Sequence, residues 1–155
     1  MRKLFPEALF LHIHRNPYDV FRSTRNLYRK LLPAFSLQRG DWETDWAAEA
    51  DRLILDSYPR MMDALERDVA DLPPERYLDL RYEAFDGQEL PHMERIYGQL
   101  NLGDFAVDRP HFERYLASIE GYQKNQFTMS PADQKRVNDQ WGQRIEKLGY
   151  EVLGG

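Results

Sequence analysis

Apolar and polar positions along the chain predict strands and helices in alternation, with much more helix than strand. Residues 8–14 form a nearly continuous apolar run after a proline, which is typical of a strand covered on both faces of a parallel sheet. Residues 76–82 alternate between apolar and polar side chains, and this period of two predicts a second strand. The pattern therefore predicts an α/β fold in which few parallel strands combine with many helices. A sheet of two strands looks incomplete.

The first helix is expected to follow the first strand directly. Asn16 is suited to be its N-cap and Pro17 its first residue, and Pro33 is expected to end it near Leu32. Apolar residues at helical spacing predict an inward stripe, and a set of arginines falls on another face. The stripe consists of Val20, Thr24, Leu27, Tyr28 and Leu31, and the arginines are Arg22, Arg25 and Arg29.

A loop is expected at residues 34–43, and a long helical pattern follows it. Pro59 interrupts this pattern, so we expect the proline to kink or divide the helix. Three shorter helices are predicted around 90–100, 112–119 and 137–148. The apolar side of the long helix is predicted to hold Trp46, Ala50, Leu53, Ile54, Met61, Leu65 and Val69.

The last of the short helices has the clearest predicted ends. Ser130-Pro131-Ala132-Asp133 is close to a capping box with proline at the first helical position. Gly149 is placed to close the helix, because glycine readily adopts the left-handed conformation found there.

Composition narrows the class of protein. Hydrophobic residues make up 42% and charged residues 30% of the 155 residues, which fits one compact soluble domain. A formal net charge of -5 argues against nucleic-acid binding over the whole surface, because such binding draws on an excess of Lys and Arg. The lack of cysteine excludes disulfides, thiolate metal sites and a cysteine nucleophile, and it fits the cytoplasm. The apolar runs are too short for export or for crossing a membrane, so we expect no membrane partner.

The junction between the first strand and the first helix carries the most informative chemistry. A helix that starts after a buried strand offers backbone N–H groups and a positive dipole end to an anion. Arg15 can add a bidentate fork, and Ser23, about two turns after Asn16, faces the same side as the helix start. Arg15 and Ser23 are therefore candidates to bind one phosphate. The alternative is a solvated arginine and a serine bonded to its own helix.

Residues 6–23 resemble the 3′-phosphate-binding segment of sulfotransferases. That family has a strand, then Arg-Asp-Pro, then Asp, and a Ser eight residues after the Arg. Arg15, Pro17, Asp19 and Ser23 stand at the matching places, whereas Asn16 replaces the usual Asp. Because Asn caps a helix as well as Asp does, the departure removes a charge without disturbing the predicted fold.

The resemblance extends along nearly the whole chain, most closely to bacterial and protein-tyrosine sulfotransferases. Residues 81–85, Arg-Tyr-Glu-Ala-Phe, are similar to the family's Arg-Tyr-Glu-Asp-Leu element, which makes Tyr82 a candidate cofactor contact; a core aromatic is the alternative. Residues 122–127 are similar to a late basic loop over the nucleotide, so Lys124 and Asn125 are weaker candidates, with a solvated lysine as the alternative. Residues 97–102 and 148–150 are also similar to family elements.

This resemblance implies sulfuryl transfer from 3′-phosphoadenosine 5′-phosphosulfate (PAPS) to a hydroxyl or amine, without a metal. It implies part of a three-layer, P-loop-type sulfotransferase fold, as a single domain over residues 1–155. The family's Gly-rich loop for the 5′-phosphosulfate and its catalytic base precede the matching segment, and no Gly-rich loop occurs in this sequence. We therefore expect an N-terminally truncated domain that binds the nucleotide weakly, is inactive alone, and pairs with a partner chain or itself to complete the sheet.

Other interpretations of the same residues remain. His14-Arg15-Asn16 is similar to a kinase catalytic loop, but Asn16 cannot act as the base and the other kinase motifs are missing. His12 and His14 lack an evident third metal ligand, so packed and hydrogen-bonded histidines are favoured. The arginine face of the first helix is expected to be solvated or to meet an acidic acceptor. The main rival is a non-catalytic helical interaction or scaffold domain that retains the fold.

Overall fold

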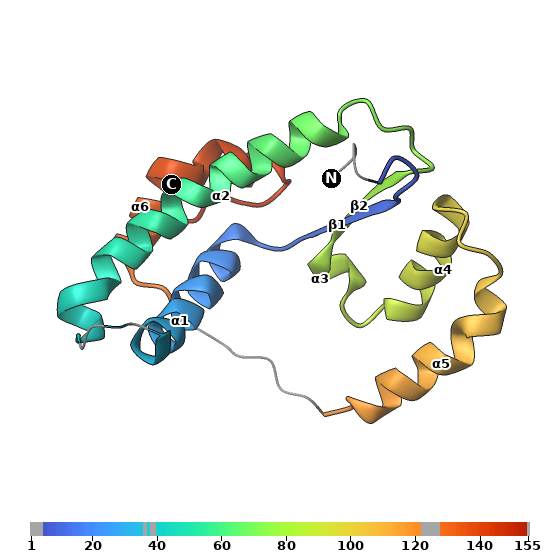
Figure 1. The fold of residues 1–155 in the computed structure, drawn as a ribbon, viewed down its shortest axis with the longest axis horizontal. Helices are drawn as coiled ribbons and strands as arrows, with labels where there is room; N and C mark the ends of the chain where they lie inside the picture. The colour runs from blue at the N-terminus through green and yellow to red at the C-terminus, as the bar shows by residue number, and fades with distance from the viewer. Residues whose placement is uncertain (1–4, 36, 38–39, 122–127, 155) are drawn as a thin grey trace. The chain divides into compact units, whose positions relative to one another are not determined.

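The computed structural model of this protein describes most of the chain (Figure 1). The described residues are 5–35, 37, 40–121 and 128–154. None of the helices within them combines the length and the apolar character that crossing a membrane requires.

The chain forms two compact units, each built from two stretches of sequence. The first unit comprises Met1–Arg15 and Arg67–Asn125. The second comprises Asn16–Glu66 and Gln126–Gly155. Whether they make up a single sulfotransferase domain stays a prediction.

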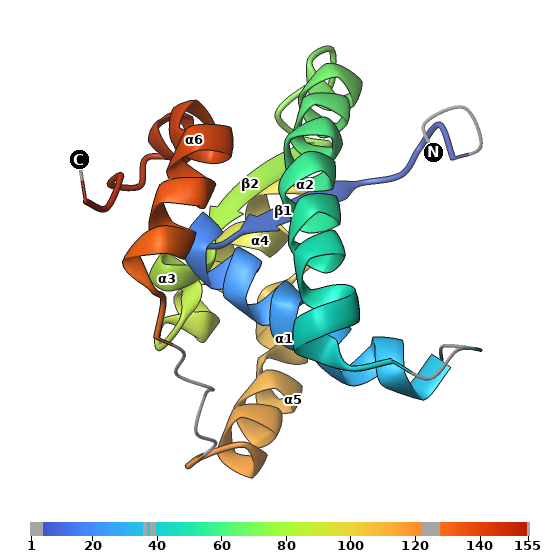
Figure 2. The same ribbon diagram turned by 90° about the vertical axis from the view of Figure 1, so that its left-hand side faces the viewer.

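A small parallel sheet forms the centre of the first unit. Strand β1 (Phe10–His14) pairs with β2 (Tyr77–Arg81), so that Phe10 lies opposite Tyr77 and His14 opposite Arg81. The two strands run side by side in both ribbon views (Figures 1 and 2). Both predicted strands and their parallel order are confirmed, and the α/β class with few strands and many helices is the observed one.

One face of the sheet is covered only in part. Helix α4 (Glu89–Gln99) packs on β2, where Leu78 and Leu80 are each 3% exposed. Leu11 and Ile13 of β1 share that face through the strand register but are 41% and 49% exposed. The expectation that the first strand is covered on both faces is therefore wrong. An apolar run shows that a strand suits burial, but it does not show which element covers it.

Two further helices complete the first unit. The short helix α3 (Tyr82–Phe85) begins directly after β2, so Tyr82 opens a helix instead of ending the strand. Helix α5 (Phe105–Ser118) packs against α4 through aromatic rings, with Tyr97 and Phe105 5.1 Å apart between ring centroids. The Tyr97 hydroxyl donates to Asp108 at 3.0 Å, which ties the two helices together.

The second unit is helical and has its own core. It contains α1 (Pro17–Phe35), the π-helical turn η1 (Trp42–Trp46), most of α2 (Ala47–Val69) and α6 (Pro131–Lys147). The boundary between the units falls within α2, after Glu66. Trp141 of α6 is fully buried and lies 4.3 Å from Tyr58 of α2 between ring centroids. The buried core residues are Tyr18, Phe21, Ile54, Leu55, Tyr58, Met62, Val137, Trp141, Ile145 and Tyr150.

Neither proline in the long helices stops its helix where expected. Helix α1 continues through Pro33 to Phe35, so the expected end near Leu32 is wrong by one short turn. Helix α2 is continuous through Pro59, so the proline does not divide it, and a kink at this position stays a prediction. A proline lacks the N–H that would bond to the carbonyl four residues earlier. At Pro59 that carbonyl belongs to Leu55, and it instead accepts the indole N–H of Trp141 at 2.9 Å.

The buried faces of α1 and α2 differ in part from the predicted stripes. On α1, Phe21 is 1% exposed, whereas Leu27 is 50% exposed. On α2, Leu53 and Met61 are exposed, and Asp51 is buried although its side chain is charged. The expectation followed hydrophobicity, but the packing of α2 against α1 and α6 buries the neighbouring face.

Both predicted ends of α6 are confirmed. The Ser130 hydroxyl accepts the backbone N–H of Asp133 at 3.1 Å, as an N-cap does. Gly149 has a φ of 75°, and Tyr150 N–H donates to the Ile145 carbonyl at 3.0 Å. With Gly149 N–H donating to the Glu146 carbonyl at 2.9 Å, these bonds form a Schellman motif.

Candidate functional site

The strand-to-helix junction forms as the sequence predicts. Strand β1 ends at His14 and helix α1 begins at Pro17. The side-chain oxygen of Asn16 accepts the backbone N–H of Tyr18 at 3.0 Å. Asn16 therefore acts as a cap, in keeping with the substitution of Asn for Asp at this position.

The backbone N–H groups in the first turn of α1 already donate to acceptors within the chain. Asp19 N–H and Val20 N–H both donate to the Asn16 carbonyl, at 2.9 and 3.1 Å, and Tyr18 N–H is taken by the Asn16 side chain. Pro17 has no N–H to offer. The expectation that free amides at this helix start bind an anion is therefore wrong. An anion here would depend on side-chain donors and on the positive end of the helix dipole.

Two of the predicted binding residues lie together in the first unit. The guanidinium carbon of Arg15 lies 4.8 Å from the centroid of the Tyr82 ring, which is a cation–π geometry. Arg15 ends the first stretch of this unit, and Tyr82 opens α3 after β2. Both residues are half-buried. The parallel pairing of β1 and β2 thus brings together side chains that are far apart in sequence.

The remaining predicted binding residues are not tested by this arrangement. Ser23 is an exposed residue of α1 and belongs to the second unit, so its shared contact with Arg15 to one phosphate stays a prediction. Lys124 and Asn125 lie outside the described residues.

A histidine pair lies on the face of the sheet opposite to the face that holds Leu11 and Ile13. His12 Nδ1 is 2.8 Å from Asp79 Oδ1, and His14 Nε2 is 3.9 Å from Asp79 Oδ2. The two imidazole rings stack with centroids 5.9 Å apart. The interpretation of packed, hydrogen-bonded histidines therefore fits their contacts. Within residues 5–35, 40–121 and 128–154, no three His, Asp or Glu side chains gather as a potential metal site.

His14 should make the stability of the chain depend on pH. Burial lowers the pKa of His14 from its ordinary value of 6.5, and the Asp79 carboxylate opposes part of this shift. The unfolded chain then binds this proton more readily than the folded chain. The contribution of neutral His14 to stability is complete above about pH 6.5 and is lost as the pH falls from there through the lower folded-state pKa.

We expect urea denaturation to give a smaller free energy of unfolding at about pH 5.5 than at about pH 7.5, and the variant His14→Gln to reduce that difference. An equal difference in the variant would exclude His14 as a source of the pH dependence.

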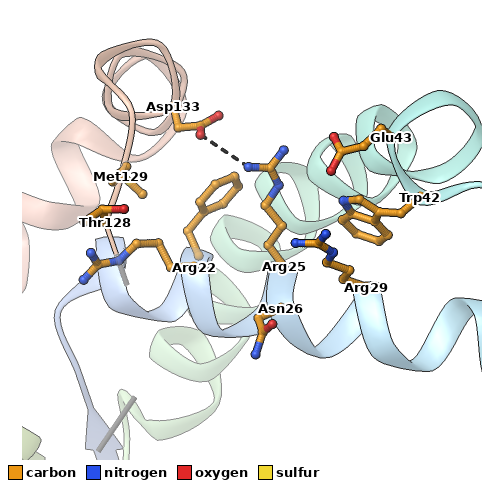
Figure 3. A pocket seen from close by; sticks show the side chains of 10 residues that line it. Arg22, Arg25, Asn26, Arg29, Trp42, Glu43, Thr128, Met129 and Asp133 are labelled. Atoms are coloured by element: carbon orange, nitrogen blue, oxygen red, sulfur yellow. Dashed lines mark hydrogen bonds and ion pairs between the residues drawn. The ribbon is translucent and has the colours of Figure 1, made fainter. Parts of the chain in front are cut away.

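A pocket of about 280 Å³ lies in the second unit beside α1 (Figure 3). Arg22, Arg25 and Arg29 reach it from α1, and the segments around Trp42 and Met129 face them. The sequence predicts the arginine face, with a solvated surface or contact with an acidic acceptor as its two interpretations. The spacing of the arginines was the available signal, whereas the two facing segments are distant in sequence and could not be placed.

A buried carboxylate fixes one side of this pocket. Asp51 is 1% exposed, and its oxygens lie 2.8 Å from Arg25 Nε and 2.9 Å from Arg136 Nη1. Asp133 lies 3.3 Å from Arg25 and 3.4 Å from Arg136. This network joins α1, α2 and α6, and sequence reasoning missed it because a charged residue on a helix is usually exposed.

A family model and two curated proteins that match this chain are all sulfotransferases. A family model described as "Sulfotransferase family" matches residues 1–106. Among curated proteins, the chain is similar to the omega-hydroxy-beta-dihydromenaquinone-9 sulfotransferases Stf3 of Mycobacterium bovis (strain ATCC BAA-935 / AF2122/97) and Mycobacterium tuberculosis (strain CDC 1551 / Oshkosh). Each is 30% identical over 149 residues, which are 96% of this chain and 37% of the relative. No solved structure gives a significant match.

These features define an α/β protein with a candidate anion site. They are a parallel strand pair, a capped helix that follows the first strand, and an arginine at the junction that contacts the Tyr82 ring. The chain belongs to the sulfotransferase family, because the family model covers more than half of it. It spans 37% of the length of the curated relatives that it matches.

Proposed function

We propose that this chain binds the 3′-phosphate side of PAPS, the sulfuryl donor that the family implies. The observation that carries the proposal is the Arg15 guanidinium stacked on the Tyr82 ring at the end of β1. The cation–π contact limits the motion of the arginine, so less conformational entropy is lost when it binds a phosphate. Arginine also matches phosphate oxygens with two parallel N–H donors.

The other proposed contacts come from the sequence motif. Ser23 follows Arg15 by eight residues, as in the family segment, and its exposed hydroxyl can donate to a phosphate oxygen. Lys124 and Asn125 are proposed to contact the nucleotide from the late basic loop. The 3′ side is favoured over the 5′ side because residues 1–155 contain no Gly-rich loop of the type that binds a 5′-phosphosulfate.

The reaction that we propose is sulfuryl transfer to a hydroxyl or amine. The bond between sulfur and the 5′-phosphate oxygen breaks, a bond from sulfur to the acceptor oxygen or nitrogen forms, and adenosine 3′,5′-bisphosphate leaves. The acceptor proton passes to a base. A hydroxyl acceptor is favoured, because the two similar mycobacterial proteins are named as sulfotransferases of an omega-hydroxy compound. Without a 5′-phosphosulfate loop, we propose that residues 1–155 turn over little on their own.

Two further parts of the proposal concern a partner chain and the location in the cell. Within the described residues each strand of the sheet is paired on one side only, which supports completion of the sheet by a partner chain or a second copy, and the half-covered face with Leu11 and Ile13 supports packing of that partner. The lack of cysteine supports a cytoplasmic location.

Adenosine 3′,5′-bisphosphate is the probe that tests this function. We expect it to bind the 155-residue chain in isothermal titration calorimetry and to raise the melting temperature. Replacing Arg15 with alanine should weaken binding by about tenfold or more, because a charge-assisted contact is lost. Replacing Tyr82 with leucine should weaken binding less, since it removes only the platform for the arginine.

The variant Arg95→Ala is the matched control. Arg95 is an exposed arginine of α4 in the same unit, so its removal changes the net charge equally without touching the proposed site. Equal affinities of the Arg15 and Arg95 variants would overturn the assignment. No binding by the unmodified chain would instead favour the non-catalytic scaffold function.

A further inference from the structure

The pocket beside α1 has a mixed lining that suits a specific kind of ligand (Figure 3). Its apolar walls are Phe21, Trp42 and Met129, of which Phe21 and Trp42 are 1% and 8% exposed. These walls belong to the folded core of the second unit, so they offer a preformed surface. A flat ring can lie against such a surface at little entropic cost.

The polar lining is rich in hydrogen-bond donors. Arg25 is held in place by Asp51 and Asp133, and its short contact from Nε to Asp51 is an ion pair that is not aligned as a hydrogen bond. In the part of the chain that the structure describes, no hydrogen bond or ion pair engages the side chains of Arg29 or Asn26. Arginine has five N–H donors and no acceptor, so these side chains can meet several ligand oxygens.

The acidic residues at the pocket do not cancel this property. Asp133 is already paired with Arg25 and Arg136, so its charge is compensated within the protein. Glu43 is an exposed side chain, and water screens its charge. The donors that remain available, at Arg29 and Asn26, favour a group with oxygen acceptors and negative charge.

We infer that this pocket binds a small aryl oxyanion, in which a phosphate, sulfate or carboxylate group is carried on a flat ring. The oxyanion contacts Arg29 and Asn26, and the ring lies against Trp42 and the partly exposed Met129. A volume of about 280 Å³ is small for a nucleotide and sufficient for one substituted ring. The inference does not depend on the proposed nucleotide site, since the pocket lies wholly in the second unit, and Arg15 and Tyr82 belong to the first.

Phenyl phosphate is the probe for this site, measured by isothermal titration calorimetry on the full chain. We expect saturable binding of one molecule, with phenol failing to bind at the same concentration because it lacks the oxyanion. Replacing Arg29 with alanine should weaken binding by about tenfold or more. Arg29 is exposed, so this variant should keep the circular dichroism spectrum and melting temperature of the unmodified chain.

The variant Lys30→Ala is the control, because it removes one positive charge from the next residue of α1, which does not line the pocket. We expect it to stay within about twofold of the unmodified chain. Arg15→Ala should also retain binding, which separates this inference from the nucleotide site. Phenyl sulfate and benzoate identify which oxyanion is preferred. Equal weakening by the Arg29 and Lys30 variants, equal binding of phenol, or no binding of any of the three oxyanions would overturn the inference.

Discussion

Replacing Trp141 with alanine should lower the free energy of unfolding by about 3–5 kcal/mol. Trp141 has no solvent exposure and contacts both Phe21 and Tyr58, with ring centroids 5.9 and 4.3 Å away. Its removal leaves a cavity where α1, α2 and α6 meet. It also removes the indole donor of the Leu55 carbonyl, which Pro59 cannot replace.

Urea denaturation followed by far-UV circular dichroism measures this loss. The variant Trp141→Phe should lose less, because it keeps a six-membered aromatic ring in the core, although it removes the pyrrole part of the indole together with its N–H group. Leu53→Ala is the control on α2, since Leu53 is 51% exposed, and it should change stability by no more than about 0.5 kcal/mol. A loss near 1 kcal/mol for Trp141→Ala would show that this core does not hold the unit together.

Replacing Asp51 with alanine should lower the free energy of unfolding by about 1.5–3 kcal/mol for an electrostatic reason, because the two arginines that lose their partner are 32% and 42% exposed and water solvates them in part. Asp51 is buried and faces two guanidinium groups, Arg25 Nε at 2.8 Å and Arg136 Nη1 at 2.9 Å. Removal of the carboxylate leaves two positive charges close together without their buried partner. Asp133 also lies near both arginines, at 3.3 and 3.4 Å, but it can compensate only part of this charge.

The control is an aspartate on the same helix in a different environment. Asp56 is 41% exposed and lies 3.7 Å from Arg52, so Asp56→Ala breaks a surface pair and should cost no more than about 1 kcal/mol. Both variants lose one negative charge, so a difference in their urea midpoints reports burial and not net charge. Similar midpoints would show that the Asp51 network contributes little to stability.

Features set by neighbouring residues could be predicted from the sequence. The Asn16-Pro17 start of α1 and the Ser130 cap and Gly149 end of α6 depend on local backbone chemistry, and all of them form as expected. The burial of Asp51 could not be predicted in the same way. Its partner Arg136 is 85 residues away in sequence, and only the packing of α2 against α6 makes a buried carboxylate favourable.

The candidate sites also combine features that the sequence predicted with features that only the fold determines. Arg15 was predicted from the strand-to-helix junction and Tyr82 from the family resemblance, and it is the pairing of β1 with β2 that brings them to 4.8 Å. The role expected for the backbone amides failed, because Asn16 accepts all three donors of the first turn. The pocket at Arg29 could not be predicted, since its walls come from segments around residues 42 and 129 that no local pattern connects with α1.

Pro59 changes how substitutions in α2 should be chosen. A ranking by helix propensity would replace this proline first, since proline is the least favourable residue inside a helix. In this chain, however, its missing N–H leaves the Leu55 carbonyl to the indole of Trp141. A residue with an N–H at position 59 would compete for that oxygen. The residues at positions 59 and 141 are therefore coupled through the Leu55 carbonyl, and substitutions at the two positions should be designed together.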